Sequence, residues 1–326
     1  MTRKIDISHK TIFFIAGFLA VLWILYHIID VILLLFVAII FMSALSPFVE
    51  KLTYWKVPRG LAIGLLYLLV VSVIIILLYL SFTPLIEQTS SLTTNLPHTL
   101  EKLLPPGIFN RNFLEQKLSD IFGNALGVTV AVFSNTIAIV SVAVLTFYLL
   151  LDKERFENLV SSAFVNNPSR AKKLIRRIED MLGAWLRGQV VLSLLIGVMS
   201  YILLLAVGMS SYALPLAILA GIMEVVPVIG PIISAIPPIL IAYVGLSPAT
   251  GLVVAIGYLL IQQSESHIIV PQVMKRAVGL NPLVVILAIA IGGRLLGIGG
   301  ALLAVPITVV AQIIVGEIIN RKESII

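Results

Sequence analysis

Residues 213–244 read ALPLAILAGIMEVVPVIGPIISAIPPILIAYV, and this stretch decides the fold. It is longer than the roughly 20 apolar residues that a membrane-crossing helix needs, and Glu224 is its single charged residue. Glycines and prolines gather in its middle, at Gly221, Pro227, Gly230, Pro231, Pro237 and Pro238. Because proline removes a backbone hydrogen bond from a helix, we expect a broken or re-entrant segment there. The alternative is a proline kink that only shapes packing.

The composition of the whole chain indicates a membrane protein. Of the 326 residues, 60% are hydrophobic and 12% are charged, with a mean hydropathy of +1.11, whereas soluble domains are about 25% charged. So few ionised side chains exclude a cytosolic enzyme, a disordered chain and a nucleic-acid-binding protein. We therefore predict an all-α, polytopic membrane protein of about eight transmembrane helices, with the broken or re-entrant segment in its C-terminal half.

The amino-terminal part, residues 1–82, contains three predicted transmembrane helices. The first two cover 11–29 and 31–47 and are joined by a tight turn at Asp30; the third covers 61–82. The loop between the second and third helices is rich in lysine and arginine. Such loops lie on the cytoplasmic side of membranes, so we expect the amino terminus in the cytoplasm as well.

The middle of the chain alternates between polar and apolar segments. Residues 83–127 lack a positive excess and are predicted to form a small external segment, and residues 128–151 form transmembrane helix 4. Residues 152–187 are the most basic part of the chain and are predicted to form a cytoplasmic amphipathic segment. Its helix either lies on the anionic membrane surface or packs on another part of the protein as a solvated helix.

Residues 188–316 are predicted to form a C-terminal core, followed by a cytoplasmic tail at 317–326. Helical crossings are expected at 188–207, 249–263, 281–293 and 295–316. The basic pair at Lys275 and Arg276 places the loop before the last two crossings inside. This orientation requires the stretch at 213–244 to enter the membrane and return on the same side.

Glu224 is the strongest candidate for a functional residue. A carboxylate near the middle of a membrane costs on the order of 3 kcal/mol, so it needs a partner, a proton or a hydrated cavity. Broken helices expose carbonyl groups to ions and polar solutes, and Pro227, Gly230 and Pro231 would shape such a site. The alternative is a glutamate at the membrane edge.

Polar residues elsewhere in the core are secondary candidates for the same pathway: Gln189, Gln262, Gln263 and Arg294. The two adjacent glutamines either line a cavity or rest at the membrane interface. Arg294 either pairs with Glu224 or Glu265, binds an anionic solute, or marks a membrane face. Gly293, Gly297 and Ala301 are small residues at helical spacing, which predicts close helix packing.

Six strings in the C-terminal half carry a family resemblance: WLRGQ (185–189), EVVPVIGP (224–231), IIVPQVM (268–274), AVGLNPLVV (277–285), GGRLLGIGG (292–300) and LLAVP (302–306). Their order and spacing resemble those of the autoinducer-2 exporter family of bacterial membrane proteins. Arg294, and His267 where an amide side chain is expected, depart from the pattern.

The resemblance implies a multi-pass, homo-oligomeric permease of the bacterial inner membrane, with 188–316 as its transport core. Family members are linked with export of the furanone signal autoinducer-2 and others with sodium (or lithium)/proton antiport. A small polar solute, or a monovalent cation and a proton, is therefore the expected cargo, and membrane lipids are the expected surroundings.

Other functions fit the sequence less well. An intramembrane protease needs an aspartate pair, a zinc motif or a serine nucleophile with its base, and the sequence contains none of these in recognisable form. The chain has no cysteine and no clustered histidines, so we expect no metal, no cofactor and no enzymatic activity. A passive channel or a membrane scaffold remains the alternative to a transporter.

Overall fold

The computed structural model of the chain describes residues 9–77, 79–80, 136–163, 168–226, 229–274 and 281–323, and every regular element in these ranges is a helix. The predicted all-α membrane fold is therefore confirmed. Five of the described helices are long and apolar enough to cross a membrane: Ile29–Tyr54, Arg59–Leu77, Pro168–Ala206, Pro248–Val273 and Leu283–Ile319. The predicted external segment at 83–127 lies outside the described residues.

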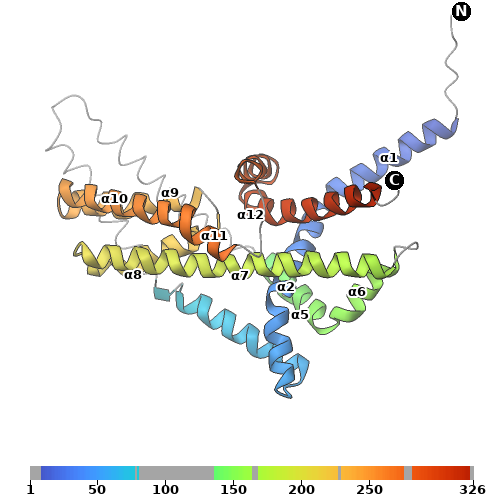
Figure 1. The fold of residues 1–326 in the computed structure, drawn as a ribbon, viewed down its shortest axis with the longest axis horizontal. Coiled ribbons are helices and arrows are strands. Elements are labelled where there is room, and N and C mark those ends of the chain that lie inside the picture. The colour runs from blue at the N-terminus through green and yellow to red at the C-terminus, as the bar shows by residue number, and fades with distance from the viewer. Residues whose placement is uncertain are drawn as a thin grey trace, which may run out of the picture.

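The first two helices, α1 (His9–His27) and α2 (Ile29–Tyr54), are joined without the predicted turn at Asp30. Ile28 donates a backbone hydrogen bond to Ile24 and accepts one from Ile32, so the helical pattern continues across the junction. The prediction was wrong because these hydrogen bonds carry the backbone past Asp30 without a turn. Consequently α1 extends away from the other helices (Figure 1).

The amino-terminal helices share one apolar core. Met42 and Val49 of α2 pack against Ile63 of the helix Arg59–Leu77 and Leu150 of α5 (Thr136–Leu151). The Tyr67 hydroxyl donates a 2.8 Å hydrogen bond to the carbonyl of Ala143 across this core. The short helix α6 (Lys153–Ser162) follows α5 and leads into α7.

The longest element of this central region is α7 (Pro168–Ala206), which contacts α2, α6, α8, α10, α11 and α12 (Figure 1). Pro168 is its first residue, where the missing backbone N–H would have no helical partner. Leu182 and Trp185 are buried against Ile40 of α2 and Val305 of α12. The apolar face of the predicted basic segment thus packs on protein, which favours the packed helix over one lying on the membrane surface.

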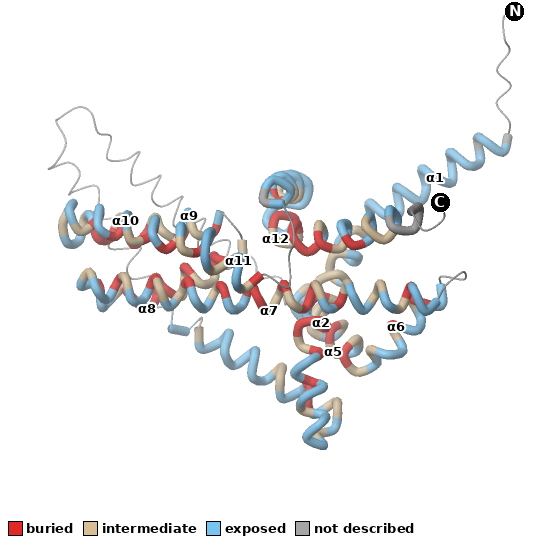
Figure 2. The backbone as a smooth tube through the Cα atoms, viewed as in Figure 1, coloured by how far each residue is buried: buried red, intermediate tan, exposed pale blue. Residues whose placement is uncertain are grey.

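Four antiparallel helix segments form the C-terminal layer. Leu204 near the end of α7, Ala213 in α8 (Ser210–Met223), Ile241 in α9 (Ile229–Gly245) and Val254 in α10 (Pro248–Ser264) belong to one core cluster. Figure 2 shows buried residues along these helices, with exposed residues on their other sides. Since the start of α8 meets the end of α9, the two helices form the expected hairpin.

The hairpin breaks between Met223 and Ile229, which is a shorter interval than the one predicted. Pro237 and Pro238 lie inside α9 and do not end it. Pro231 falls in the first turn of α9, where a backbone N–H has no helical acceptor to lose. The prolines of residues 213–244 therefore interrupt the helix at fewer places than their number in the sequence suggested.

The predicted crossing at 249–263 continues further than expected. After α10, a π-helix η1 (Glu265–Ile269) and α11 (Val270–Val273) extend the rod through Pro271. Val270 donates its backbone N–H to the carbonyl of Glu265, the five-residue spacing of a π-helix. Since Pro271 cannot donate to the carbonyl of His267, the looser spacing accommodates it.

The last element, α12 (Pro282–Glu323), is kinked at Leu296 and Gly297, so that its two arms run in different directions (Figure 1). Gly297 has a φ of 62°, a conformation that favours glycine. The arms approach closely at Gly292 and Gly300, where an added Cβ would lie 2.4 Å and 2.1 Å from the opposite carbonyl oxygen. Gly297 therefore forms the turn, which corrects its predicted role in helix packing. Gly293 faces Ala301 across the arms, and a Cβ added at Gly293 would lie 3.7 Å from the Cβ of Ala301.

Candidate functional site

The break between α8 and α9 is held by a side chain from α7. Gln189 is buried, and its Nε2 donates a 2.7 Å hydrogen bond to the backbone carbonyl of Glu224. The carbonyl of Met223 accepts a bond from Val226, so two carbonyls at the end of α8 have partners. Helix ends leave such carbonyls without helical partners, and burying one without a donor would be costly. The structure thus brings together two of the predicted site residues, Gln189 and Glu224.

Gly230 allows α9 to start directly against the end of α8. A Cβ at this position would lie 1.8 Å from the Met223 carbonyl oxygen. No residue with a side chain fits there unless the backbone moves. Gly230 and Pro231 therefore lie at the break, as predicted, whereas Pro227 is outside the described residues.

The carboxyl group of Glu224 faces a second carboxyl group, that of Glu265 at the start of η1. Their side chains lie within hydrogen-bonding reach of each other, with only 2% of Glu224 and 8% of Glu265 exposed. One oxygen of each, Oε2, accepts no hydrogen bond from any described residue. Two ionised carboxylates cannot bond to each other, whereas one shared proton would permit an O–H···O bond.

The acid pair, defined as Glu224 and Glu265, has no cationic partner among the described residues. Arg294, a predicted partner, lies on the exposed surface of α12. The reason is tertiary, because α12 packs on α7 and on its own second arm rather than on η1. In the part of the chain that the structure describes, no group of three potential metal-binding side chains occurs.

The end of the α10–η1–α11 rod is held against α7 close to the acid pair. Gly188 of α7 leaves space for Met274, because a Cβ added at Gly188 would lie 2.9 Å from the Met274 sulfur. Gln189 is the next residue in the sequence. The contact with the end of α11 and the contact that caps Glu224 therefore come from adjacent positions of α7.

A cavity of about 340 Å³ opens beside the acid pair, between α9 and α10. Most of its lining is apolar, and its polar side chains are Ser234, Tyr258, Gln262 and Glu265. Small-molecule sites are commonly apolar cavities of about this size with a few polar groups. Gln262 thus lines the cavity, while the adjacent Gln263 is exposed and does not.

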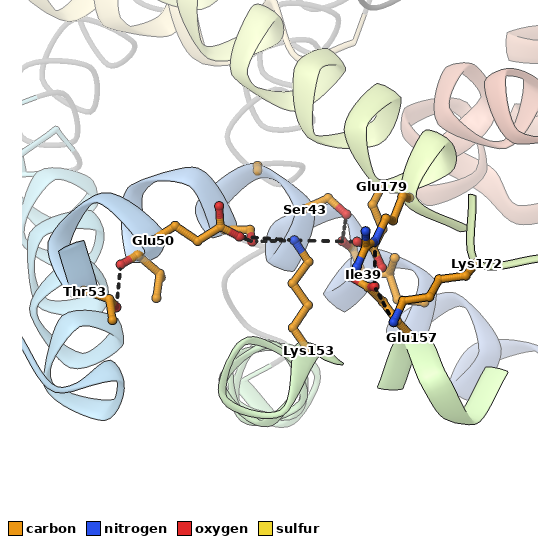
Figure 3. A network of polar contacts seen from close by, with 12 residues as sticks. Ile39, Ser43, Glu50, Thr53, Lys153, Glu157, Lys172 and Glu179 are labelled. Carbon is orange, nitrogen blue, oxygen red and sulfur yellow. Dashed lines mark hydrogen bonds and ion pairs between the residues drawn. The ribbon is translucent and has the colours of Figure 1, made fainter. Parts of the chain in front are cut away.

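A second group of charges lies apart from the acid pair and joins α2, α6 and α7. Lys153 lies between Glu50 and Glu179 (Figure 3), with nitrogen–oxygen distances of 3.4 Å and 3.8 Å. Buried Glu157 accepts a 2.9 Å hydrogen bond from Arg176. We call these five residues the charge cluster. Each of its three carboxylates has a cation within 4.0 Å, so we assign the cluster to helix packing.

Arg187 makes the neighbouring contact between α7 and α2. Its guanidinium donates 3.2 Å hydrogen bonds to the backbone carbonyls of Ser43 and Ala44. Pro47 lies four residues after Ser43 and has no N–H to give to that carbonyl. Arg187 thus donates a hydrogen bond to the Ser43 carbonyl, which receives none from Pro47.

Glu265 is the site residue that the sequence did not single out for the pathway. Its position after the polar residues at 262–264 was consistent either with the membrane interface or with a cavity lining. A second acid at the end of a predicted crossing was the available signal, but the pairing with Glu224 depends on how α8 and α10 pack. Tyr258, which was not among the candidates predicted from the sequence, also lines the cavity.

Comparisons with known proteins identify a family of transport proteins. A family model described as AI-2E family transporter matches residues 12–320. YrrI of Bacillus subtilis (strain 168) is 29% identical over 307 residues, which are 88% of this chain and 86% of YrrI. The AI-2 transport protein TqsA of Escherichia coli (strain K12) is 29% identical over 300 residues, which are 88% of this chain and 84% of TqsA.

A relative from Haemophilus influenzae is 31% identical over 302 residues, which are 88% of this chain and 85% of that protein. The matches extend over nearly the whole chain, from the amino-terminal helices to α12, and the relatives are named for transport rather than for an enzymatic reaction. With its multi-pass helical fold and its helix break in the same chain, the protein belongs to the AI-2E family of transporters.

Proposed function

We propose that the protein is a secondary transporter that moves a small polar solute and uses the acid pair to bind a proton or a monovalent cation. The observation that carries this proposal is the position of Glu224 and Glu265: side by side, buried, at a helix break, and without a cationic partner among the described residues.

Exclusion of water determines how much charge the acid pair can carry. Two negative charges in contact repel each other strongly when water is excluded. The pair therefore stays buried only while it holds a proton or a cation, and losing that ion favours a state in which water reaches it. A broken helix at the same place provides free backbone carbonyls, which are a common part of ion and solute sites in transporters.

The solute is proposed from the cavity and from one relative. TqsA is named an AI-2 transport protein, and a cavity of about 340 Å³ with four polar side chains suits a solute of that small size. Sodium (or lithium)/proton antiport is the second candidate, because carboxylate and carbonyl oxygens are also ligands for hard cations. If flux neither saturates with solute concentration nor depends on a proton or sodium gradient, the protein is a passive channel instead.

Transport by purified protein in proteoliposomes tests the proposal. Autoinducer-2 uptake, and sodium-driven proton movement reported by a pH-sensitive dye, are measured between pH 5 and 9. We expect Glu224→Gln and Glu265→Gln each to remove the pH dependence of flux, because a neutral amide cannot release a proton. Glu154→Gln, at an exposed position of α6, is the matched control. Unchanged flux and pH dependence in both acid-pair variants would refute the proposal.

We also propose the bacterial inner membrane as the location, with both termini in the cytoplasm, and assembly as a homo-oligomer. The orientation is supported by contacts between segments predicted on the same side. The charge cluster joins residues near the first basic loop to residues 152–187, and Arg170 of α7 pairs with Glu317 near the end of α12. A mass measurement on the detergent-solubilised protein tests the oligomer, and a monomeric mass would refute it.

A further inference from the structure

Buried hydroxyl groups extend away from the acid pair along α7 and α10. Six buried side-chain oxygens have no hydrogen-bond partner among the described residues. One belongs to Glu179 in the charge cluster. The other five belong to Glu224, Glu265, Ser193, Ser200 and Tyr258. Unpartnered polar atoms are rare in protein interiors, so five in one region require a common explanation.

Contacts of α7 with α8 and α10 bring these five groups near one face of α7. Ser193 lies against Gly221, since a Cβ added at Gly221 would be 2.8 Å from the Ser193 carbonyl oxygen, and Glu224 follows directly after the end of α8. Further along α7, the Ser200 hydroxyl lies beside the Tyr258 hydroxyl of α10. The rise of a helix makes the distance from Gln189 to Ser200 about 16 Å along α7.

Other hydroxyl groups in the described helices behave differently. Ser43, Thr53 and Thr308 each donate a hydrogen bond of 2.7 or 2.8 Å to the carbonyl four residues earlier. This is the usual way in which a helix satisfies a serine or threonine away from water. Ser193 and Ser200 make no such bond, although both lie well inside α7.

We infer that Ser193, Ser200 and Tyr258 line a hydrated track that continues from the acid pair, and that the Ser200–Tyr258 hydroxyl pair is a second polar subsite on it. The pair presents two donors and several acceptor lone pairs without any charge. It therefore suits water and the uncharged hydroxyl or carbonyl groups of a small solute. Tyr258 also lines the cavity that contains Glu265, two turns away on α10. The inference extends the proposed transport function beyond the helix break.

The absence of cysteine from the chain permits a direct test. Ser193→Cys and Ser200→Cys are each introduced alone into the full-length protein in proteoliposomes. Their reaction with a cationic, water-soluble methanethiosulfonate is followed by mass spectrometry. Leu204→Cys is the buried control on the same helix, because Leu204 is 0% exposed within an apolar core. Since the thiolate is the reactive species and forms only where water reaches it, we expect both serine positions to react at least about tenfold faster than Leu204→Cys.

The hydroxyl pair is tested by adding Tyr258→Phe to Ser200→Cys. Losing the tyrosine hydroxyl is expected to slow the labelling of the cysteine, whereas Tyr243→Phe on α9, outside the cavity lining, should not. Thermal unfolding checks that each variant is folded. If Ser200→Cys does not fold, the labelling rate of Ser193→Cys alone tests the track. Labelling at the rate of Leu204→Cys would overturn the track. Repeating the labelling in Glu224→Gln protein separates the two proposals. Hydration of the track does not require coupled transport, so the serine positions should still be labelled quickly in this variant whether or not its transport depends on pH.

Discussion

At the scale of the residue, the site depends on a few contacts that permit no substitute. Gln189 caps the Glu224 carbonyl, and Gly230 allows α9 to begin against the end of α8. Neither residue is charged or reactive. Their contribution is to hold a helix break open in a place where unbonded backbone groups are otherwise unfavourable.

Gly230→Ala is predicted to destabilise the protein by about 3 kcal/mol or more, because overfilling a packed contact commonly costs 1–3 kcal/mol and here the new Cβ meets backbone rather than a flexible side chain. Thermal unfolding in detergent measures the effect. Gly245→Ala at the other end of α9 is the control, since an added Cβ there has nothing within 4 Å. Equal stability of the two variants would contradict the packing described at the break.

At the scale of the element, α7 is the common support. Its first half contacts α2 and α6 through charges, its middle holds the acid pair, and its last turns contribute to the core with α8, α9 and α10. Because one rigid helix carries these contacts, a disturbance in the charge cluster is expected to affect stability without changing the chemistry of the acid pair.

Lys153→Met is predicted to lower the free energy of unfolding by about 1–3 kcal/mol, because it leaves the nearly buried Glu179 carboxylate without its closest cation. Chemical unfolding in detergent measures this loss. Lys173→Met, at an exposed position of α7, should change stability by only about 0.5 kcal/mol. If the Lys153 variant is as stable as that control, the charge cluster has no role in packing.

At the scale of the whole molecule, orientation can be tested without a substrate. We predict that Lys56→Cys, in the first basic loop, is labelled by an impermeant thiol reagent only after the cells are permeabilised, because basic loops stay in the cytoplasm. Ser91→Cys, in the segment predicted to be external, should react in intact cells. The reverse pattern would invert the proposed topology and leave the family assignment unchanged.

The sequence by itself determined the membrane class, the helical fold and the position of the helix break. These features depend on local quantities: apolar length, the backbone hydrogen bonds that proline removes, and the cost of a carboxylate in an apolar stretch. Predictions from local sequence patterns failed where the surrounding structure determines the conformation. Asp30 suggested a turn that continuous backbone hydrogen bonds exclude, and Gly297 had the spacing of a packing residue but forms a turn.

Only the tertiary structure decided which acid faces Glu224. Glu265 and Arg294 were both available from the sequence, and the choice depended on how α8 and α10 each pack on α7 and α9, with Glu265 at the start of the π-helix. The Ser200–Tyr258 pair has the same origin, since its members are far apart along the chain. Such contacts arise when separate helices pack, and no pattern within one helix encodes its position relative to another.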